Sequence, residues 1–255
     1  MARGTVGVNM RRDYTLARLY VADDLSSGAD VCLSPEQAHY LAKVLRLSVG
    51  AHLRVFNGRD GEWQADIQNL DKKNARLCAK SQLRPQEPSP DIWLCFALLK
   101  KQRNGIIAEK ATELGVSRFQ PIVTERTQFP KLRFERAHAQ ILEAAEQTER
   151  MDIPTLAETL TLDALIATWP RERILFFADE GGGAPPMLKA LSGRGFGPSA
   201  LLVGPEGGFN EKERNALRGQ DFVVPVSLGP RILRADTAAL SMLTLWQSVY
   251  EEQSV

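Results

Sequence analysis

Residues 201–209 (LLVGPEGGF) and 228–238 (LGPRILRADTA) decide the fold of this chain. Short apolar runs at 201–203 and 222–224 precede the two glycine-bearing loops, and each run predicts a buried strand. Asn210, with Glu213 three residues later, predicts the capped start of a helix after the first loop. Two such loops at the ends of neighbouring strands predict a ligand-binding edge of an α/β sheet, and ordinary strand-to-helix turns are the alternative.

The composition is that of a soluble globular protein with one large or two modest domains: 255 residues, 44% hydrophobic, 25% charged, net charge +1. This charge does not indicate a nucleic-acid binder, so any basic surface must come from local clustering. No apolar run predicts a membrane span, and the start lacks the apolar core of a secretory signal. Cys32, Cys78 and Cys95 match no metal or redox spacing. We therefore expect a cytoplasmic protein without a metal or membrane partner.

The first third of the chain predicts a small β-barrel, a shape often used to hold RNA, at residues 18–84. Runs at 53–56, 63–67 and 75–79 alternate in polarity and predict an antiparallel meander. Ser34, followed by proline and then Gln37, predicts a helix start with a capping box. Residues 1–17 are expected to be a flexible extension that leads into the first strand.

Proline-rich residues 85–90 predict a linker, and strands alternate with helices over residues 91–255. This rhythm predicts a largely parallel sheet with helices on both faces. The predicted strands are 93–99, 118–123, 174–178, 201–203 and 222–224, and the predicted helices are 104–114, 134–150, 162–169 and 237–250. The last helix carries apolar residues too widely spread for one contact stripe, so we expect burial on two sides, with a second subunit as one candidate cover.

Basic residues cluster after the first two strands of this region. They are Lys100, Lys101, Arg103, Arg126, Lys131, Arg133 and Arg136. Loops at carboxyl strand ends face the ligand crevice, so this cluster suits contacts with a phosphate backbone. Plain solvation of a surface is an equally good interpretation.

Several familiar chemistries are excluded by the motifs. The chain has no G-x-x-x-x-G-K-[ST] phosphate loop, and the GRGFG at 193–197 precedes a strand instead of following one, which predicts a flexible connection. The three histidines, His39, His52 and His138, lie outside the glycine loops, and no Ser-His-acid, Cys-His or metal-ligand pattern is present.

The paired glycine loops resemble the motifs of the RsmE family, the 16S ribosomal RNA uracil-N3 methyltransferases of the SPOUT (trefoil-knot) superfamily. Further similarity lies in EKATELGV at 109–116, TER at 124–126, AEQ at 145–147, and residues 39–50 with FNG at 56–58. The sequence departs from the family at Thr148-Glu149-Arg150, where a glycine usually precedes the arginine.

The resemblance implies an α/β fold with a C-terminal SPOUT trefoil knot and a small N-terminal PUA-like β-barrel. It also implies S-adenosylmethionine as cofactor, 16S ribosomal RNA or the small ribosomal subunit as partner, and a homodimer. The implied cofactor-binding residues are Phe177 or Ala178, Val203, Gly204, Glu206, Gly207, Gly208, Leu228, Gly229, Ile232, Leu233 and Thr237.

The implied reaction needs a proton acceptor, because N3 of uracil carries a weakly acidic proton. Glu206 and Asp236 compete for this role, and Arg234 is the candidate cation that stabilises the anionic ring. Equally good interpretations are that Glu206 fixes its own loop and that Asp236 caps the last helix. The residues expected to bind RNA are Arg18, Arg46, Lys100, Lys101, Arg103 and Arg126. A sister SPOUT enzyme with another target and a non-catalytic ribosome-assembly factor are the alternative functions.

Overall fold

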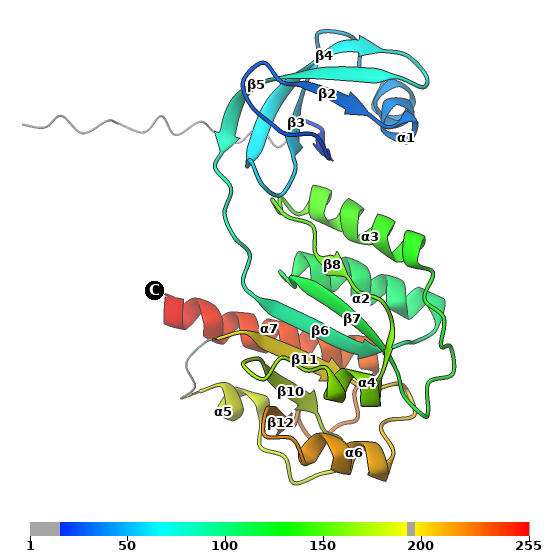
Figure 1. Cartoon of the computed structure of the whole chain (residues 1–255), viewed down its shortest axis with the longest axis vertical. Coiled ribbons are helices and arrows are strands. Elements are labelled where there is room, and N and C mark those ends of the chain that lie inside the picture. The colour runs from blue at the N-terminus through cyan, green and yellow to red at the C-terminus, as the bar shows by residue number, and fades with distance from the viewer. Residues whose placement is uncertain (1–15, 193–196, 255) are drawn as a thin grey trace, which may run out of the picture. The chain divides into compact units, whose positions relative to one another are not determined.

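The computed structural model describes residues 16–192 and 197–254 (Figure 1). Most of the predicted extension at 1–17 and of the GRGFG connection therefore lies outside the described residues. The chain divides into two compact units between Glu87 and Pro88, a boundary that falls inside the predicted linker. Among the helices that are described, none is long and apolar enough to cross a membrane.

The N-terminal unit contains one five-stranded sheet with the order β1-β3-β4-β5-β2. Its elements are β1 (Arg18–Tyr20), β2 (Asp30–Leu33), α1 (Pro35–His39), the π-helical turn η1 (Tyr40–Val44), β3 (His52–Phe56), β4 (Glu62–Leu70) and β5 (Ala75–Arg84). The predicted antiparallel meander is β3-β4-β5. β1 pairs parallel with β3, and β2 was not predicted. The capping box of α1 is present, with Ser34 accepting from the Gln37 backbone.

A buried charge cluster lies inside the N-terminal unit, around the carboxylate of Glu62. This carboxylate accepts hydrogen bonds from Arg18 and Arg84 and lies 3.7 Å from a guanidinium nitrogen of Arg54. The guanidinium of Arg18 also stacks 3.8 Å above the ring of Phe56. Arg18 was predicted to bind RNA, but its side chain is only 3% exposed, so the prediction is corrected to a structural role within this unit.

The C-terminal unit contains a seven-stranded sheet in which all pairings are parallel. Its order is β12-β10-β11-β6-β7-β8, with β9 also paired to β7. The strands are β6 (Ile92–Ala97), β7 (Arg118–Val123), β8 (Thr155–Leu156), β9 (Leu160–Thr161), β10 (Ile174–Ala178), β11 (Ser199–Val203) and β12 (Val223–Val226). The helices are α2 (Lys101–Glu113), α3 (Phe134–Gln147), α4 (Leu162–Ala167), α5 (Met187–Leu191), α6 (Glu211–Arg218) and α7 (Ala235–Ser254).

Helices cover both faces of this sheet, as predicted (Figure 1). Side chains of α2, α3, α5 and α7 share one core with alternate strand residues such as Leu94 and Leu201. Side chains of α4 and α6 share the other core with Cys95 and Leu202. The strands therefore read as continuous apolar runs because both of their faces are buried. Elements too short to leave a periodic signal, namely β8, β9 and α5, were not predicted.

The last helix is buried more completely by its own chain than expected. Met242, Leu243, Trp246 and Val249 of α7 all belong to the core it shares with α2 and α5, and Trp246 is 2% exposed. Its wide apolar surface is thus explained within one chain. The prediction of a homodimer is untouched by this, but Trp246 is already covered and is not a free contact surface.

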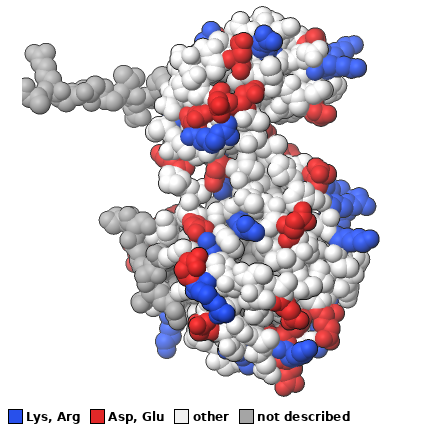
Figure 2. Space-filling model, viewed as in Figure 1, with Lys and Arg blue, Asp and Glu red and all other residues white. Residues whose placement is uncertain are grey.

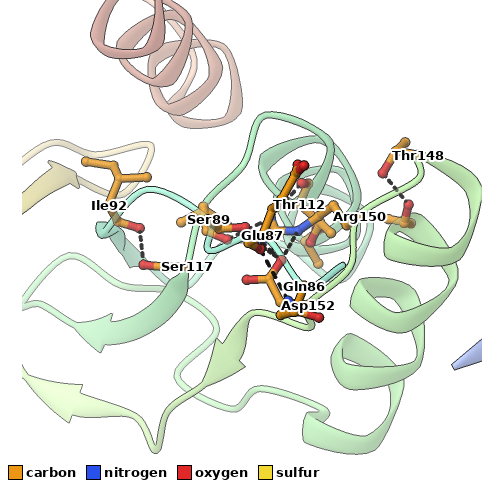
Figure 3. Close-up of polar contacts among 12 residues, drawn as sticks. Gln86, Glu87, Ser89, Ile92, Thr112, Ser117, Thr148, Arg150 and Asp152 are labelled. Atoms are coloured by element: carbon orange, nitrogen blue, oxygen red, sulfur yellow. Dashed lines mark hydrogen bonds and ion pairs between the residues drawn. The ribbon is translucent and has the colours of Figure 1, made fainter. Parts of the chain in front are cut away.

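Hydrogen bonds of Arg150 and Asp152 connect Ser89, at the start of the C-terminal unit, to the end of α2 (Figure 3). Its guanidinium donates to the backbone carbonyls of Thr112 and Val116, at 2.9 and 2.8 Å, and to the carboxylate of Asp152 at 3.0 Å. Asp152 in turn accepts from the hydroxyl of Ser89 at 2.7 Å. These bonds close the carbonyl end of α2, where a cation is favoured electrostatically.

The turn that aims Arg150 requires a left-handed backbone at Glu149, which has φ +64°. This is the position at which the resembled family usually has glycine, and it explains why α3 ends at Gln147 and not at the predicted residue 150. A side chain in this conformation costs about 1 kcal/mol, which glycine avoids. The glutamate at this position thus keeps the turn but strains the backbone, which destabilises the folded state.

We expect Glu149→Gly to raise the free energy of unfolding by about 1 kcal/mol. The matched control is Glu143→Gly in the middle of α3, which should lower it by about 0.5–1 kcal/mol because glycine weakens a helix interior. Chemical denaturation of the two variants beside the unchanged protein measures both effects. Destabilisation by both substitutions would show that Glu149 is not strained.

Candidate functional site

Three loops at one edge of the parallel sheet enclose a cavity of about 330 Å³. They follow β10, β11 and β12, which are neighbours in the sheet, so their carboxyl ends lie together. The loop after β11 and the loop after β12 are the two predicted glycine loops. The third wall begins at the predicted residue Ala178. Its remainder, at residues 179–184, was missed, although DEGGG at 179–183 also follows a buried strand and carries the same signal.

Most of the predicted cofactor-binding residues line this cavity. Those in the lining are Ala178, Val203, Gly204, Glu206, Gly208, Leu228, Gly229, Ile232 and Leu233. Phe177, Gly207 and Thr237 are not in it. Phe177 is instead a core residue whose ring meets that of Phe209 edge to face, with centroids 5.1 Å apart. Ala178 is therefore the residue of β10 that faces the cavity.

Two glycines of the loop after β11 stand where a side chain would not fit. A Cβ on Gly204 would lie 2.7 Å from the ring of Phe209, which folds back over the loop. Gly208 has φ +67°, and a Cβ there would lie 1.6 Å from the carboxylate of Glu180. The backbone amide of Gly208 also closes the turn by donating to the carbonyl of Pro205 at 2.9 Å. These two glycines therefore let the ring of Phe209 and the carboxylate of Glu180 lie directly against the backbone of the loop.

Gly208→Ala is expected to weaken binding at this cavity by at least tenfold, because the new Cβ both opposes the positive φ and displaces Glu180. Calorimetric titration with S-adenosylmethionine measures the loss. The control is Gly208→Ala in a Glu180→Ala background, compared with Glu180→Ala alone. This background removes the clash but keeps the backbone strain, so Gly208→Ala should cost less affinity there than in the unchanged protein. Unchanged affinity in the single variant would contradict the geometry described for Gly208.

Polar contacts from neighbouring loops hold these walls in place. Asp179 is buried, accepts from the amide of Gly181 and pairs with Arg218 of α6. The guanidinium of Arg126, after β7, donates to the carbonyl of Gly207 at 2.8 Å. Asn210 caps α6 as predicted, and its side chain also donates to Glu125 at 2.6 Å. The predicted RNA contact Arg126 thus also supports the glycine loop.

Arg103 joins the two carboxylates that were predicted to compete as base. Its guanidinium donates to both oxygens of Asp236, at 3.0 and 2.8 Å, and lies 3.8 Å from Glu206. Asp236, in the first turn of α7, also accepts from the amide of Thr237 at 3.1 Å and is 13% exposed. Glu206 is 35% exposed and lines the cavity. Arg103 was predicted to bind RNA. In the structure, its guanidinium forms ion pairs with these two carboxylates.

The remaining predicted residues are accessible. Arg234 is exposed in the cavity lining, and Lys100 and Lys101 are exposed at the start of α2. Arg46 is exposed after η1, in the N-terminal unit. Within the described ranges, no group of three or more His, Cys, Asp or Glu side chains is placed to hold a metal ion.

Comparison with known families matches both units. A family model described as an RNA methyltransferase domain matches residues 85–247, and one described as an RNA methyltransferase PUA domain matches residues 33–77. Ribosomal RNA small subunit methyltransferase E from Rickettsia conorii is 31% identical over 228 residues, which cover 89% of this chain and 93% of that protein. The protein of the same name from a Synechocystis species is 36% identical over 225 residues, covering 87% and 74%.

Solved structures agree with these matches. A Legionella pneumophila structure in complex with S-adenosylmethionine is 31% identical, with a TM-score of 0.81, and covers 91% of this chain and 97% of that one. Ribosomal RNA small subunit methyltransferase E from Neisseria gonorrhoeae, bound to S-adenosylmethionine, is 25% identical, with a TM-score of 0.81, covering 92% and 98%. The predicted fold class, a SPOUT α/β unit with a small PUA-like β unit, is confirmed. The chain belongs to the RNA methyltransferase family that includes ribosomal RNA small subunit methyltransferase E.

Proposed function

We propose that this chain transfers the methyl group of S-adenosylmethionine to N3 of a uridine in 16S ribosomal RNA. The observation that carries the proposal is the cavity at the edge of the parallel sheet, which both family-type glycine loops line. Membership of the family supports the methyl transfer and the ribosomal RNA substrate. The choice of N3 rests on the RsmE resemblance and on the side chains around the cavity.

The cavity fits S-adenosylmethionine in size, and its walls carry both carboxylates and guanidinium groups for the charged groups of the cofactor. Its volume of about 330 Å³ lies within the range of about 300–1,000 Å³ that small-ligand sites occupy. Backbone groups of the glycine loops can approach an adenine edge closely because no Cβ intervenes. The carboxylates of Glu180 and Glu206 face the same space and favour the cationic sulfonium and amino groups. When bound, the cofactor supplies an electrophilic methyl group.

Side chains in and beside the cavity provide the proton acceptor and the cation that the reaction needs. A proton must leave N3 of the uracil before or as its lone pair attacks the methyl carbon. Glu206 is the better acceptor, because its carboxylate is partly exposed in the cavity and has only a 3.8 Å contact with Arg103. Asp236 already accepts two hydrogen bonds from Arg103, and a proton taken up by this carboxylate would oppose them. Arg234 provides a cation for the anionic ring, and Arg103 orients Glu206.

The proposed setting is the cytoplasm, with a homodimer acting on 16S ribosomal RNA or the small ribosomal subunit. The PUA-domain match supports an RNA partner. A non-catalytic assembly factor would use the same RNA surfaces but would not need a cofactor cavity.

Thermal unfolding with and without S-adenosylmethionine separates these functions. A ligand that binds only the folded state at 100 times its Kd stabilises it by about 2.7 kcal/mol. The test continues with small subunits isolated from cells that lack this gene, incubated with enzyme and cofactor. Nucleoside mass spectrometry should then find N3-methyluridine. A methylated ribose or another base would establish a sister activity, and the absence of both stabilisation and methylation would overturn the proposal.

A further inference from the structure

A second, smaller cavity of about 110 Å³ lies where α2 and α3 begin. It shares no lining residue with the cavity between the glycine loops. Lys101 from α2, Lys131 and Arg133 from the segment before α3, and Arg136 from α3 line it. Basic side chains gather at this edge of the C-terminal unit in Figure 2. Four residues of the basic cluster identified in the sequence thus line this one cavity.

The positive charge of this cavity is not neutralised by the protein. No acidic residue lines it, and none of the four cations has an ion-pair or hydrogen-bond partner among the described residues. The guanidinium groups of Arg136 and Arg133 lower the pKa of Lys101. By contrast, Arg103 pairs with carboxylates and Arg126 with a carbonyl. Like charges held together without a counter-charge favour an anionic ligand.

The walls of the cavity are preorganised. The side chain of Asn104 bonds to both the backbone amide and the carbonyl of Leu99, each at 2.9 Å, and so fixes the turn that opens α2. Gly105 lets α3 pack closely, since a Cβ there would lie 2.8 Å from the amide of Gln140. The ring of Phe129 lines the cavity and is 43% exposed. An anion site here therefore lies beside an accessible aromatic face.

We propose that this second cavity binds a backbone phosphate of single-stranded RNA and that the adjoining base stacks on Phe129. The cavity is too small for a whole nucleotide cofactor but suits a phosphate group. A cationic pocket beside an exposed aromatic ring is the combination that single-stranded nucleic acids use. The first turn of α2 carries Lys101 at this cavity and Arg103 beside Glu206, so the bound segment flanks the nucleotide at the first cavity. This inference rests on the proposed RNA substrate.

The test compares two variants with equal charge changes in the full-length chain, Lys101→Gln/Lys131→Gln and Lys189→Gln/Lys212→Gln. The control lysines are exposed on α5 and α6, away from the lining of the second cavity. Affinity for 16S ribosomal RNA is measured over a series of salt concentrations. The cavity variant should bind at least tenfold more weakly, and its salt dependence should fall by about one to two phosphate contacts. S-adenosylmethionine affinity should be unchanged.

A third variant, Phe129→Leu, tests the stacking part. It should weaken RNA binding about fivefold or more without changing the salt dependence, because stacking releases no counterions. If the unchanged protein binds RNA and the cavity variant binds as well as the control, this inference is overturned while the proposed function stands. If the unchanged protein neither binds nor methylates ribosomal RNA, the proposed function fails first.

Discussion

Glu206→Gln is expected to slow single-turnover methyl transfer by a factor of about 10²–10⁴, the usual contribution of a general base. Glutamine keeps the shape of the side chain but cannot take the N3 proton. Cofactor affinity should fall much less than the rate, since backbone groups do most of the binding. The deficit should shrink at high pH, where the N3 proton leaves to solvent without help. Single-turnover rates across pH, with 16S ribosomal RNA in small subunits, measure all three effects.

Asp236→Asn is the matched comparison, because it also neutralises a carboxylate that contacts Arg103. It should disturb the orientation of Arg103 and reduce the rate at all pH values without the rescue at high pH. A near-normal rate for Glu206→Gln with a large, pH-dependent loss for Asp236→Asn would exchange the two roles. Near-normal rates for both would show that neither carboxylate is the base.

Glu62→Gln is expected to destabilise the N-terminal unit by about 3–5 kcal/mol, because it leaves buried arginines around a neutral side chain. Glu62 is 2% exposed, and Arg18 and Arg84 donate to it. A unit of this size has a total stability of only about 5–10 kcal/mol, so most of its stability would be lost. Thermal unfolding of the full-length variant should show an early transition. Asp24→Asn, which breaks an exposed pair with Arg59, is the control and should change stability by less than about 1 kcal/mol.

The same cluster predicts a pH dependence. Burial raises the pKa of Glu62, but the hydrogen bonds from Arg84 and Arg18 outweigh burial and hold it below its usual value. A lowered pKa in the folded state contributes stability above the unfolded-state value of about 4.3. This contribution is lost as the pH falls through the folded-state pKa. Unfolding measured below pH 5 should therefore show the N-terminal unit losing stability in the unchanged protein and much less further loss in Glu62→Gln.

The sequence predicted what is encoded locally. The buried strands of the parallel sheet, the caps at Ser34 and Asn210, and both glycine loops follow from short patterns of apolar, capping and glycine residues. The strand β2 was not predicted, because it has only four residues and two of them are exposed. The SPOUT assignment needed a family resemblance, since the order of strands in a sheet is not a local property.

The parts of the site that the sequence could not predict depend on distant residues. Arg103 and Asp236 are 133 positions apart in the chain, so no spacing indicates their ion pair. The sequence around Arg18 does not indicate that its side chain is buried, because its partner Glu62 lies on another strand. The division of the basic cluster into engaged residues, such as Arg103, and unpaired ones, such as Lys101, likewise appears only in three dimensions.

The central claim is tested most directly by mapping modified nucleotides in 16S ribosomal RNA from cells with and without this gene. The account predicts a single N3-methyluridine that is absent from the deletion strain, returns with the unchanged gene, and does not return with the Glu206→Gln variant. An identical set of methylated uridines in both strains, or loss of a methyl group from ribose or from another base, would contradict it.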